Sequence, residues 1–447
     1  MRLIRLSSQA SDVVIVGKSL GDRQVFICGS LSRPASSPPM YNPTPVDSLY
    51  GLPTMVSLRY GGLAARALQS VSTLQGQQAS SASYADNALA AAKALQTWYD
   101  APSGLWSTTG WWNSANCLTV LADWASLAAP AAQTLNIAGI ISNTFSNAQR
   151  VVVTAQKTVS ATGLITSTYQ MQSLEKRGFS QFLNNFYDDE GWWALALIRS
   201  WDVTRQQAYL DMAERIFKDM QAGTDTKCGG GIWWSKERAY KNAIANELYL
   251  SVAASLANRI AGKKQQYLQI AKDEWAWFKK SGMINKDNLV NDGLKINADG
   301  SCVNNGMNTW SYNQGVVLGG LVELSKATGD SSYLTEAAAI AKAAIKLLSD
   351  SDGIIREVDK CEPNCGNDGS QFKGIFVRNL HYLHRAAPQD VFRTAIRKNA
   401  DSIWAHDRND KNQLGIKWTG PPDLGGGPNA STHSSAMDVI VAALAAA

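Results

Sequence analysis

The chain carries three consecutive carboxylates inside an aromatic run, Phe186-Tyr187-Asp188-Asp189-Glu190-Gly191-Trp192-Trp193. Adjacent carboxylates repel each other, so at least one of them should have a raised pKa in a partly buried site. An ionised carboxylate beside a protonated one is the pair that cleaves glycosidic bonds, one as nucleophile or base and the other as acid. The flanking aromatic side chains offer flat faces on which sugar rings can stack. The run therefore indicates a carbohydrate-cleaving centre.

The same run also has a purely structural interpretation. It lies where a loop turns into an apolar helix, and acidic side chains are favourable in the first turn of a helix because of its dipole. We expect this explanation to hold for Glu190, which should face outward or cap backbone groups. For Asp188 and Asp189, the polar and aromatic loops elsewhere in the chain favour a catalytic role.

The composition limits the classes of protein to be considered. The 447 residues are 45% hydrophobic and 18% charged, which is typical of a globular chain with a large core. The net charge is only +5 and no basic stripe accompanies the aromatic residues, which argues against nucleic acid as a partner. No stretch reaches the roughly 18 apolar residues that a transmembrane helix needs. The 15 tryptophans, many of them beside loop residues, suit a carbohydrate cleft.

The cysteines and histidines give no metal site. Six cysteines leave the disulfide pairing open. The segment Cys361-Glu362-Pro363-Asn364-Cys365 could close a small disulfide loop or provide half of a metal site. The four histidines are scattered, and no further ligands lie at a spacing that suits zinc. We therefore predict no metal and no cofactor.

The first 80 residues differ from the rest of the chain. Residues 1–80 are rich in Ser, Pro and Gly and keep no helical period, so we expect a flexible or poorly structured region, or a mispredicted start. They contain no clear signal peptide, because the apolar segment Val13-Val14-Ile15-Val16 is too short for one. Residues 81–447 consist of Ala- and Leu-rich amphipathic segments, and we predict a single domain there.

Within residues 81–447 a pair of helices joined by a short turn is repeated. A Tyr-Leu pair follows each turn, at Tyr209-Leu210, Tyr267-Leu268 and Tyr333-Leu334, which leaves room for two helices and two loops per unit. Apolar periodicity predicts twelve helices and no convincing strand, near residues 83–100, 112–128, 136–157, 187–203, 206–222, 239–258, 264–281, 308–327, 331–348, 370–386, 389–407 and 432–446. Twelve helices in such pairs fit an all-α (α/α)6 barrel with alternating inner and outer layers.

Long loops rich in Trp, Asn and Gly introduce the helices that we take as inner, so these loops should gather on one face. Their side chains are candidates for substrate binding: Trp112, Asn113, Asn116, Asn185, Tyr187, Trp192, Trp234, Asn246, Asp292, Trp310, Tyr312, Gln314, Lys373 and Arg378. The tryptophans could instead belong to the core, and the asparagine and glutamine side chains could cap helices. Lys373 and Arg378 are five residues apart at a helix start, so only one of them need face the cavity.

Four loop motifs match one family in order and rough spacing. They are Tyr187-Asp188-Asp189-Glu190-Gly191-Trp192-Trp193, Gly230-Gly231-Ile232-Trp233-Trp234, Thr309-Trp310-Ser311-Tyr312-Asn313-Gln314-Gly315 and Phe372-Lys373-Gly374-Ile375-Phe376. Over residues 82–446 the chain resembles glycoside hydrolase family 76, the endo-α-1,6-mannanases of bacteria and fungi with their fungal cell-wall relatives. The resemblance implies an (α/α)6 barrel and a retaining mechanism, with Asp188 as nucleophile and Asp189 as acid/base. Asp292 also matches a family pattern. Residues 1–80, where the family would carry a secretion signal, are not covered.

The resemblance implies a secreted or cell-wall-associated monomer that hydrolyses α-1,6-mannan polysaccharide or mannooligosaccharides internally. A retaining mechanism needs carboxyl groups about 5–5.5 Å apart, which neighbouring residues at a loop–helix junction can reach. One alternative is transglycosylation, in which a sugar hydroxyl replaces water and wall mannoprotein is remodelled. A second is a non-catalytic carbohydrate-binding barrel, although both aspartates are present. A third is a protein-binding helical scaffold, which the single acidic pair ringed by Trp and Asn disfavours.

Overall fold

The structure, a computed structural model, describes residues 4–6, 13–15, 83–160, 163, 165–173 and 180–447. The chain divides into two units, residues 1–64 and 65–447. In the first unit, β1 (Ile4–Leu6) and β2 (Val13–Ile15) pair antiparallel. The remainder of the predicted flexible region, residues 1–80, lies outside the described residues.

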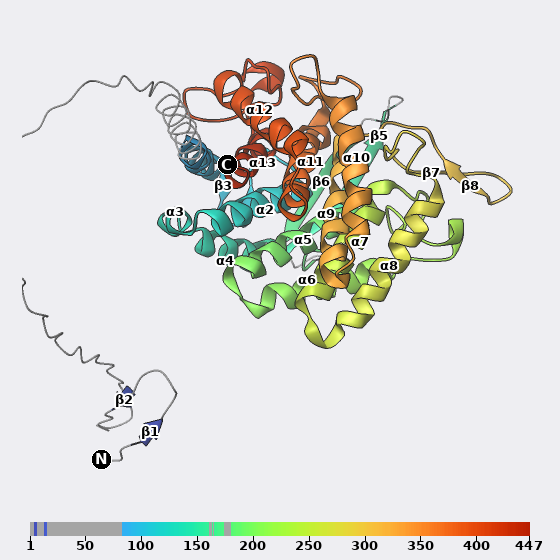
Figure 1. Cartoon of the computed structure of the whole chain (residues 1–447), viewed down its shortest axis with the longest axis horizontal. Helices are drawn as coiled ribbons and strands as arrows, with labels where there is room; N and C mark the ends of the chain where they lie inside the picture. Colours follow the sequence, from blue (N-terminus) through green and yellow to red (C-terminus); the bar gives the residue numbers. More distant parts are fainter. Residues whose placement is uncertain (1–3, 7–12, 16–82, 161–162, 164, 174–179) are drawn as a thin grey trace, which may run out of the picture. The chain divides into compact units, whose positions relative to one another are not determined.

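Six helices form a closed inner ring. They are α2 (Trp111–Leu127), α5 (Tyr187–Thr204), α7 (Ala243–Arg259), α9 (Ser311–Thr328), α11 (Gly366–Ala386) and α13 (Ala430–Ala445). Each packs against the next and α13 packs against α2, which closes the ring (Figure 1). Nearly every residue of α2 and α7 is buried, as expected for helices with neighbours on all sides. A side chain at Gly374 would collide with the backbone of Ser435, so glycine lets α11 and α13 approach closely.

A second layer of helices surrounds the ring. It contains a helix over residues 83–95 together with α4 (Ile137–Ala148), α6 (Gln207–Gln221), α8 (Lys264–Ser281), α10 (Ser332–Leu348) and α12 (Asp390–His406). These helices bury one stripe each, as α6 does through Tyr209, Ala213 and Phe217. Among the described residues, twelve helices of seven or more residues thus alternate between the two layers, and a six-residue helix, α3 (Ala129–Thr134), follows α2. The predicted (α/α)6 barrel is confirmed.

The two ends of the barrel differ in their connections. Long segments such as 222–242 and 282–310 lead into the inner helices at one end, which we call the loop face. Short turns such as 205–206 and 329–331 join inner to outer helices at the other end, the turn face. The predicted gathering of long loops on one face is therefore confirmed.

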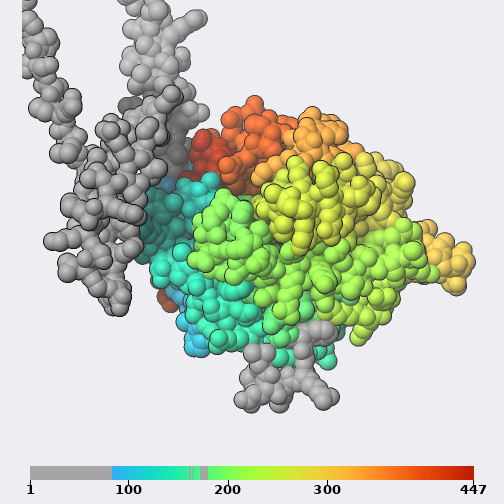
Figure 2. All heavy atoms as spheres, turned by 90° about the horizontal axis from the view of Figure 1, so that it is seen from below, coloured from blue at the N-terminus to red at the C-terminus, as the bar shows by residue number. Residues whose placement is uncertain are grey.

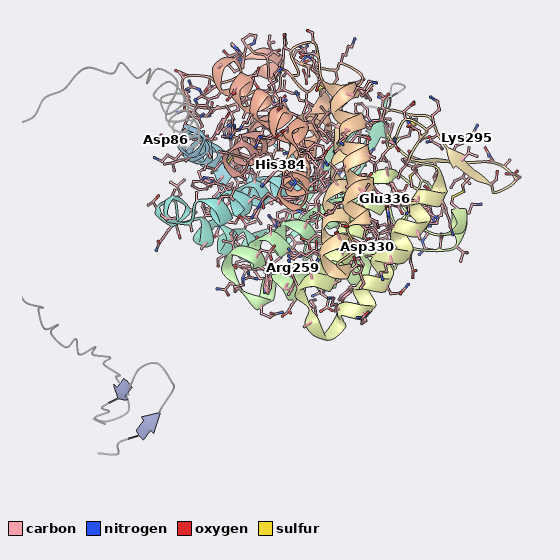
Figure 3. The ribbon with its side chains drawn as sticks, in the orientation of Figure 1. Asp86, Arg259, Lys295, Asp330, Glu336 and His384 are labelled. Carbon is pink, nitrogen blue, oxygen red and sulfur yellow. A yellow bond between two sulfur atoms is a disulfide. The ribbon has the colours of Figure 1, made fainter. Side chains whose placement is uncertain are left out.

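Alternating charges link the inner helices at the turn face. Arg199 of α5 donates to Asp123 of α2 (2.7 Å), and Arg259 of α7, labelled in Figure 3, donates to Asp202 of α5 (2.7 and 2.9 Å). Arg259 also donates to Glu323 of α9 (2.9 Å). These charge-assisted bonds tie four consecutive inner helices together. A cavity of about 380 Å³ lies beside them, lined in part by Arg199, Arg259 and Glu323.

The expectation of no strands is wrong. The segment 136–157 is predicted as one helix, but α4 ends at Ala148 and β5 (Val151–Val159) pairs antiparallel with β6 (Ile165–Ser173). The run Val151-Val152-Val153-Thr154 explains the difference, because β-branched residues favour strands over helices. We call the β5–β6 hairpin the strap.

The loops also contain two shorter strand pairs and two disulfides. β3 (Tyr99–Asp100) pairs with β4 (Leu105–Trp106), while β7 (Leu294–Ile296) and β8 (Cys302–Asn304) project from the helical body (Figures 1 and 2). Cys228 bonds to Cys302, and Cys361 to Cys365, so the short cysteine loop forms a disulfide. Cys117 is buried and free, and Cys28 lies outside the described residues. No helix in the described part of the chain combines the length and apolar character that crossing a membrane requires.

Candidate active site

The carboxylate run occupies the start of α5 on the loop face. Phe186 is extended (φ −122°, ψ 125°), and Asp188, Asp189 and Glu190 form the first helical turn, where the dipole favours negative charge. Asp188 is 6% exposed, and Asp189 and Glu190 are fully buried. Burial of three charged groups in one turn requires specific partners for each of them.

Three donors surround Asp189. Lys157 Nζ donates to Oδ1 (2.6 Å), while Asn184 Nδ2 (2.7 Å) and the Tyr169 hydroxyl (3.3 Å) donate to Oδ2. Burial raises the pKa of Asp189 to about 7; the Lys157 ammonium opposes this rise and the charge of Asp188 adds to it. The Asp189 carboxyl can therefore carry a proton near neutral pH, as a general acid must.

Asp188 has donors on one oxygen only. Its Oδ2 accepts from Lys157 Nζ (2.8 Å) and from Trp234 Nε1 (2.9 Å). Its Oδ1 has no hydrogen-bond partner among the described residues. A carboxyl group with one oxygen held by donors and the other without a protein partner is placed for nucleophilic attack through that second oxygen.

Glu190 is bonded away from the pair. Its Oε1 accepts from the backbone N–H of Asn184 (3.0 Å) and from Lys236 Nζ (2.8 Å), and burial raises its pKa well above the usual value. The expected backbone cap is present, whereas the alternative of an outward-facing side chain is wrong. Glu190 thus fixes Asn184, which in turn holds Asp189.

The strap covers the pair. Successive side chains of a strand point to opposite faces, and Thr154, Gln156 and Thr158 of β5 are exposed while Lys157 points inward with its side chain 3% exposed. Asn185 anchors β5 through bonds to the N–H and C=O of Ala155 (both 2.8 Å). Burial disfavours the charged form of Lys157, but Asp188, Asp189 and Asp368 together raise its pKa.

Further carboxylates lie close to Asp188. Asp292 accepts from the Tyr240 hydroxyl (2.6 Å), and Asp368 accepts from Trp112 Nε1 (2.6 Å); each leaves one oxygen without a partner among the described residues. Burial raises the pKa of Asp292 to about 6; the Tyr240 bond opposes this, and the charge of Asp188 adds to it. Glu247 is fully buried, and burial followed by the charge of Asp292 raises its pKa well above normal. The site therefore contains several buried carboxyl groups besides Asp188 and Asp189.

Aromatic rings form a continuous layer in this part of the barrel. Trp112 stacks on Trp192 (ring centroids 5.4 Å apart), and Phe372 contacts Trp112, Trp310 and Tyr312. All five are at most 4% exposed. The predicted substrate-binding residues Trp112, Trp192, Trp310 and Tyr312 are thus brought together, but as a packed layer with little exposed surface.

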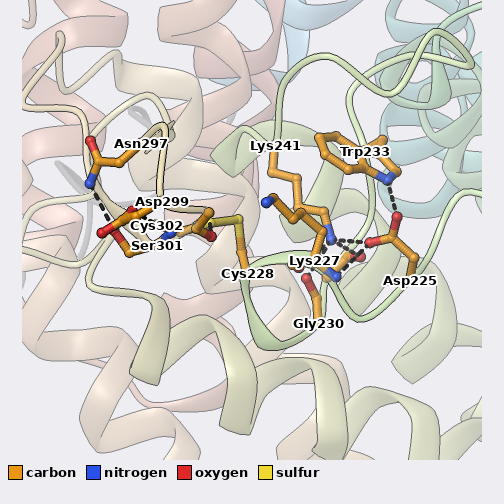
Figure 4. Close-up of a disulfide and its surroundings, with 12 residues drawn as sticks. Asp225, Lys227, Cys228, Gly230, Trp233, Lys241, Asn297, Asp299, Ser301 and Cys302 are labelled. Atoms are coloured by element: carbon orange, nitrogen blue, oxygen red, sulfur yellow. Dashed lines mark hydrogen bonds and ion pairs between the residues drawn. A yellow bond between two sulfur atoms is a disulfide. The ribbon is translucent and has the colours of Figure 1, made fainter.

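Hydrogen bonds and a buried lysine hold the loop that carries Trp234. Trp234 donates its backbone N–H to Tyr240 O (2.8 Å) and accepts from Tyr187 N (2.9 Å), and Tyr187 itself is buried. Lys241, fully buried, donates to the carbonyl oxygens of Lys227 (2.8 Å) and Gly230 (2.6 Å) and to Asp225, beside the Cys228–Cys302 disulfide (Figure 4). These bonds fix the loop that carries Trp234.

Several predicted substrate-binding groups are bonded within the protein. Asn246 and Gln314 bond to both backbone groups of Ile232 and of Val290, respectively, and Asn185 anchors the strap. Lys373 pairs with Glu362 and donates to Ile416 O (2.9 Å). Arg378 pairs with Asp438 and donates to Asn116 (2.8 Å). Asn113 is fully buried with no side-chain partner in the described part of the chain.

A groove with a volume of about 460 Å³ borders the strap. It lies against the N-terminal ends of α2, α11 and α13, and its lining is rich in hydroxyl and amide groups: Thr108, Thr109, Gly110, Ser167, Thr168, Tyr169, Met171, Gly366, Asn367, Ser370, Asn429 and Ser431. Tyr169 links the groove to Asp189. Such a lining suits the hydroxyl groups of sugars. Across the described residues, no group of three or more His, Cys, Asp and Glu side chains is arranged to hold a metal ion.

Five residues around the pair are absent from the sequence-based candidates. Asn184 lies four residues before Asp188, and Asp368 lies in the first turn of the inner helix α11, so the attention to loop–helix junctions that picked Asp188 could have found both. Glu247 is the fifth residue of α7, beyond its first turn. Lys157 and Tyr169 reach the site through the strap. Their only sequence signal is the β-branched character of the two strands.

Comparisons with known proteins agree with this geometry. The family profile described as Glycosyl hydrolase family 76 matches residues 83–447. A putative mannan endo-1,6-α-mannosidase of Schizosaccharomyces pombe is 31% identical over 219 residues, covering 46% of this chain and 48% of that protein. Mannan endo-1,6-α-mannosidase DFG5 of Candida albicans is 30% identical over 240 residues, covering 50% and 52%. The chain thus spans about half the length of the curated relatives it matches.

Solved structures share the fold. An inactive variant of the α-1,6-mannanase GH76A of Salegentibacter, changed at two consecutive aspartates and bound to α-1,6-mannotriose, superposes with a TM-score of 0.66 at 20% identity. The match covers 81% of this chain and 100% of that one. Dfg5 of Chaetomium thermophilum, in complex with glucosamine, superposes with a TM-score of 0.65 at 17% identity, covering 81% and 90%.

Proposed function

The chain belongs to glycosyl hydrolase family 76, and we propose that it hydrolyses α-1,6-linked mannan within the polymer, with retention of configuration. The observation that carries the proposal is the Asp188–Asp189 pair at the start of an inner helix, on the loop face of the barrel. The mannan-cleaving activity in the names of the relatives supports it. So does the mannanase that is inactive when two consecutive aspartates are changed.

In the proposed reaction, Asp188 attacks the anomeric carbon and forms a glycosyl ester. Asp189 transfers its proton to the departing glycosidic oxygen, then takes a proton from the water that hydrolyses the ester. Trp234 holds Asp188 through its indole N–H, and Asn184 holds Asp189 through its amide. Both bonds are made within the protein, so the two carboxyl groups are oriented before the substrate arrives.

The groove beside the strap is the proposed path for the mannan chain. Its hydroxyl and amide groups match sugar hydroxyls, and it meets the carboxylate pair at Tyr169. Asp292 and Asp368 interact electrostatically with Asp188, and each has one oxygen without a partner among the described residues, which would accept a hydrogen bond from the sugar bound there. We assign the substrate contacts to these groups rather than to Asn116, Asn246, Gln314, Lys373 and Arg378, whose polar atoms are bonded within the protein.

We also propose that residues 81–447 form the catalytic domain of a secreted or cell-wall-associated protein. The disulfides Cys228–Cys302 and Cys361–Cys365 support this location, because disulfides persist in oxidising compartments. Their placement in loops that border the site would help to keep those loops ordered outside the cell.

The proposed function is tested by product release from linear α-1,6-mannan. We expect short mannooligosaccharides of several lengths early in the reaction, because an endo-acting enzyme cuts at internal bonds. Products lengthened or joined to an added acceptor sugar would instead identify a transglycosidase. Binding of mannan without any turnover would leave a non-catalytic carbohydrate-binding barrel and refute the proposal.

The pH dependence of kcat/KM provides a second test. Asp189 must be protonated to act as an acid, and its pKa is raised to about 7, so the protonated fraction falls as the pH rises through that value. We therefore expect kcat/KM to fall about tenfold per pH unit above roughly pH 7. Initial rates between pH 4 and pH 9 measure this limb. An alkaline limb centred near the ordinary pKa of an aspartic acid would show that Asp189 is not the acid.

A further inference from the structure

We propose that Lys157 is an internal competitor of the substrate: its ammonium occupies the position of the scissile bond, and the strap must swing away before mannan can bind. This inference rests on the proposed function of the Asp188–Asp189 pair. The two carboxyl groups of a retaining glycosidase flank the bond that is cut. Lys157 Nζ lies 2.8 Å from Asp188 Oδ2 and 2.6 Å from Asp189 Oδ1, and so fills the space between them.

Burial shows that no sugar can share this space with the lysine. The Lys157 side chain is 3% exposed, Asp188 is 6% exposed and Asp189 is fully buried. The ammonium also lies over the rings of Phe186 and Trp234, 4.6 and 5.4 Å from their centroids. A hexose that reaches Asp188 must therefore displace the lysine from both carboxylates and from the aromatic walls.

The charge of Lys157 resembles that of the reacting sugar. The transition state of glycoside cleavage has oxocarbenium character, so positive charge develops at the anomeric carbon between the two carboxyl groups. In the closed state the ammonium places a positive charge in the same space. The buried carboxylates are thereby compensated while the site is empty. Replacing the lysine by a sugar leaves them to stabilise the charge of the reaction instead.

The outer part of the strap is weakly attached. Ala155 and Ile165 pack with Phe186 and Trp234 in a small cluster separate from the main core, whereas Val153, nearer the base, belongs to the core itself. Further links are the Asn185–Ala155 bonds, the Tyr169–Asp189 bond and the packing of β6 against α11. Few buried apolar contacts and a handful of polar bonds are typical of segments that open locally.

The test compares Lys157→Met with Lys157→Arg and with Gln156→Met. Methionine keeps an apolar stem without the charge, arginine keeps the charge, and Gln156 is an exposed neighbour on the opposite face of the same strand. Hydrogen exchange of the strap amides is measured without substrate, and kcat and KM are measured on α-1,6-mannooligosaccharides. We expect Lys157→Met to accelerate strap exchange and lower KM about tenfold, because the open fraction rises. Lys157→Arg should restore slow exchange, and Gln156→Met should change neither quantity.

The outcomes separate this inference from the proposed function. An unchanged exchange rate and an unchanged or higher KM in Lys157→Met would overturn it, because a lysine that contacts substrate or merely stabilises the fold gives that result. Faster exchange of the strap amides in Lys157→Met, together with no mannan cleavage by the native protein, would support the role of Lys157 in holding the strap closed. It would refute the proposed glycosidase function.

Discussion

An Asp188→Ala variant should lose at least about a thousandfold in kcat on an aryl α-mannoside with a good leaving group. The reason is that the glycosyl ester forms on the Asp188 carboxylate, which alanine removes. Added azide should restore turnover, because it can enter the space left by the carboxylate and displace the aryl oxide directly. Attack from the face that Asp188 occupies gives the β-mannosyl azide, with inverted configuration. Product analysis by NMR measures this.

An Asp189→Ala variant should behave differently on the same substrate. A good leaving group departs without acid assistance, so the glycosyl ester still forms on Asp188, and its hydrolysis becomes slow without a base. Azide needs no base and should release the α-mannosyl azide, with retained configuration. If Asp188→Ala gave the α-mannosyl azide and Asp189→Ala gave the β-mannosyl azide, the roles of the two aspartates would be reversed.

The matched control is Glu190→Gln, in the same helical turn. Glu190 is bonded to Asn184 and Lys236 rather than to the pair, so this variant should hydrolyse with retention and show no azide product. Azide rescue of Glu190→Gln would instead make the third carboxylate part of the catalytic pair.

The barrel could be predicted from the sequence because its signals are local. Apolar periodicity and the repeated Tyr-Leu pairs locate the helices, and the predicted range 308–327 agrees closely with α9, Ser311–Thr328. The placement of Asp188 and Asp189 on the loop face follows from the same pattern, since long loops precede inner helices. This placement depends only on the order of helices and loops along the chain. It does not depend on a contact between residues distant in sequence.

The strap and its lysine could not be predicted in the same way. Lys157 reaches Asp188 and Asp189 only because β5 pairs with β6 and folds across the start of α5, more than thirty residues along the chain. The segment 136–157 has enough apolar residues for a helix, but the β-branched residues near its C-terminal end favour a strand there. A single cation that contacts two carboxyl groups from a distant strand is a tertiary contact that no sequence spacing indicates.

The polar candidates illustrate a different limit. Arg378 follows a family-like motif on an inner helix, and the sequence does not reveal which partners it meets. In the structure its guanidinium donates to Asp438 from Nε (2.8 Å) and Nη2 (2.6 Å), and to Asn116 from Nη1 (2.8 Å). Both members of the ion pair are almost fully buried. Their position between α11 and α13 indicates a structural role in closing the ring.

An Arg378→Met variant should therefore lose about 3–5 kcal/mol of unfolding free energy, because Asp438 is left buried without its counter-charge. Urea unfolding at pH 7 measures this loss. The double variant Arg378→Met with Asp438→Leu should recover most of it, since an apolar pair of similar volume needs no compensation. The loss in the single variant should be smaller at pH 5, where the lone carboxyl takes up a proton and becomes neutral.

A structural role and a substrate-binding role of Arg378 predict changes in different quantities, the unfolding free energy and KM respectively. If Arg378 held the mannan chain, Arg378→Met would raise KM and leave the unfolding free energy nearly unchanged, and the double variant would not recover activity. If it closes the ring, the double variant should fold and turn over with a KM near that of the native chain. The double variant is decisive, because only the structural role allows a pair of apolar residues to replace a pair of charges.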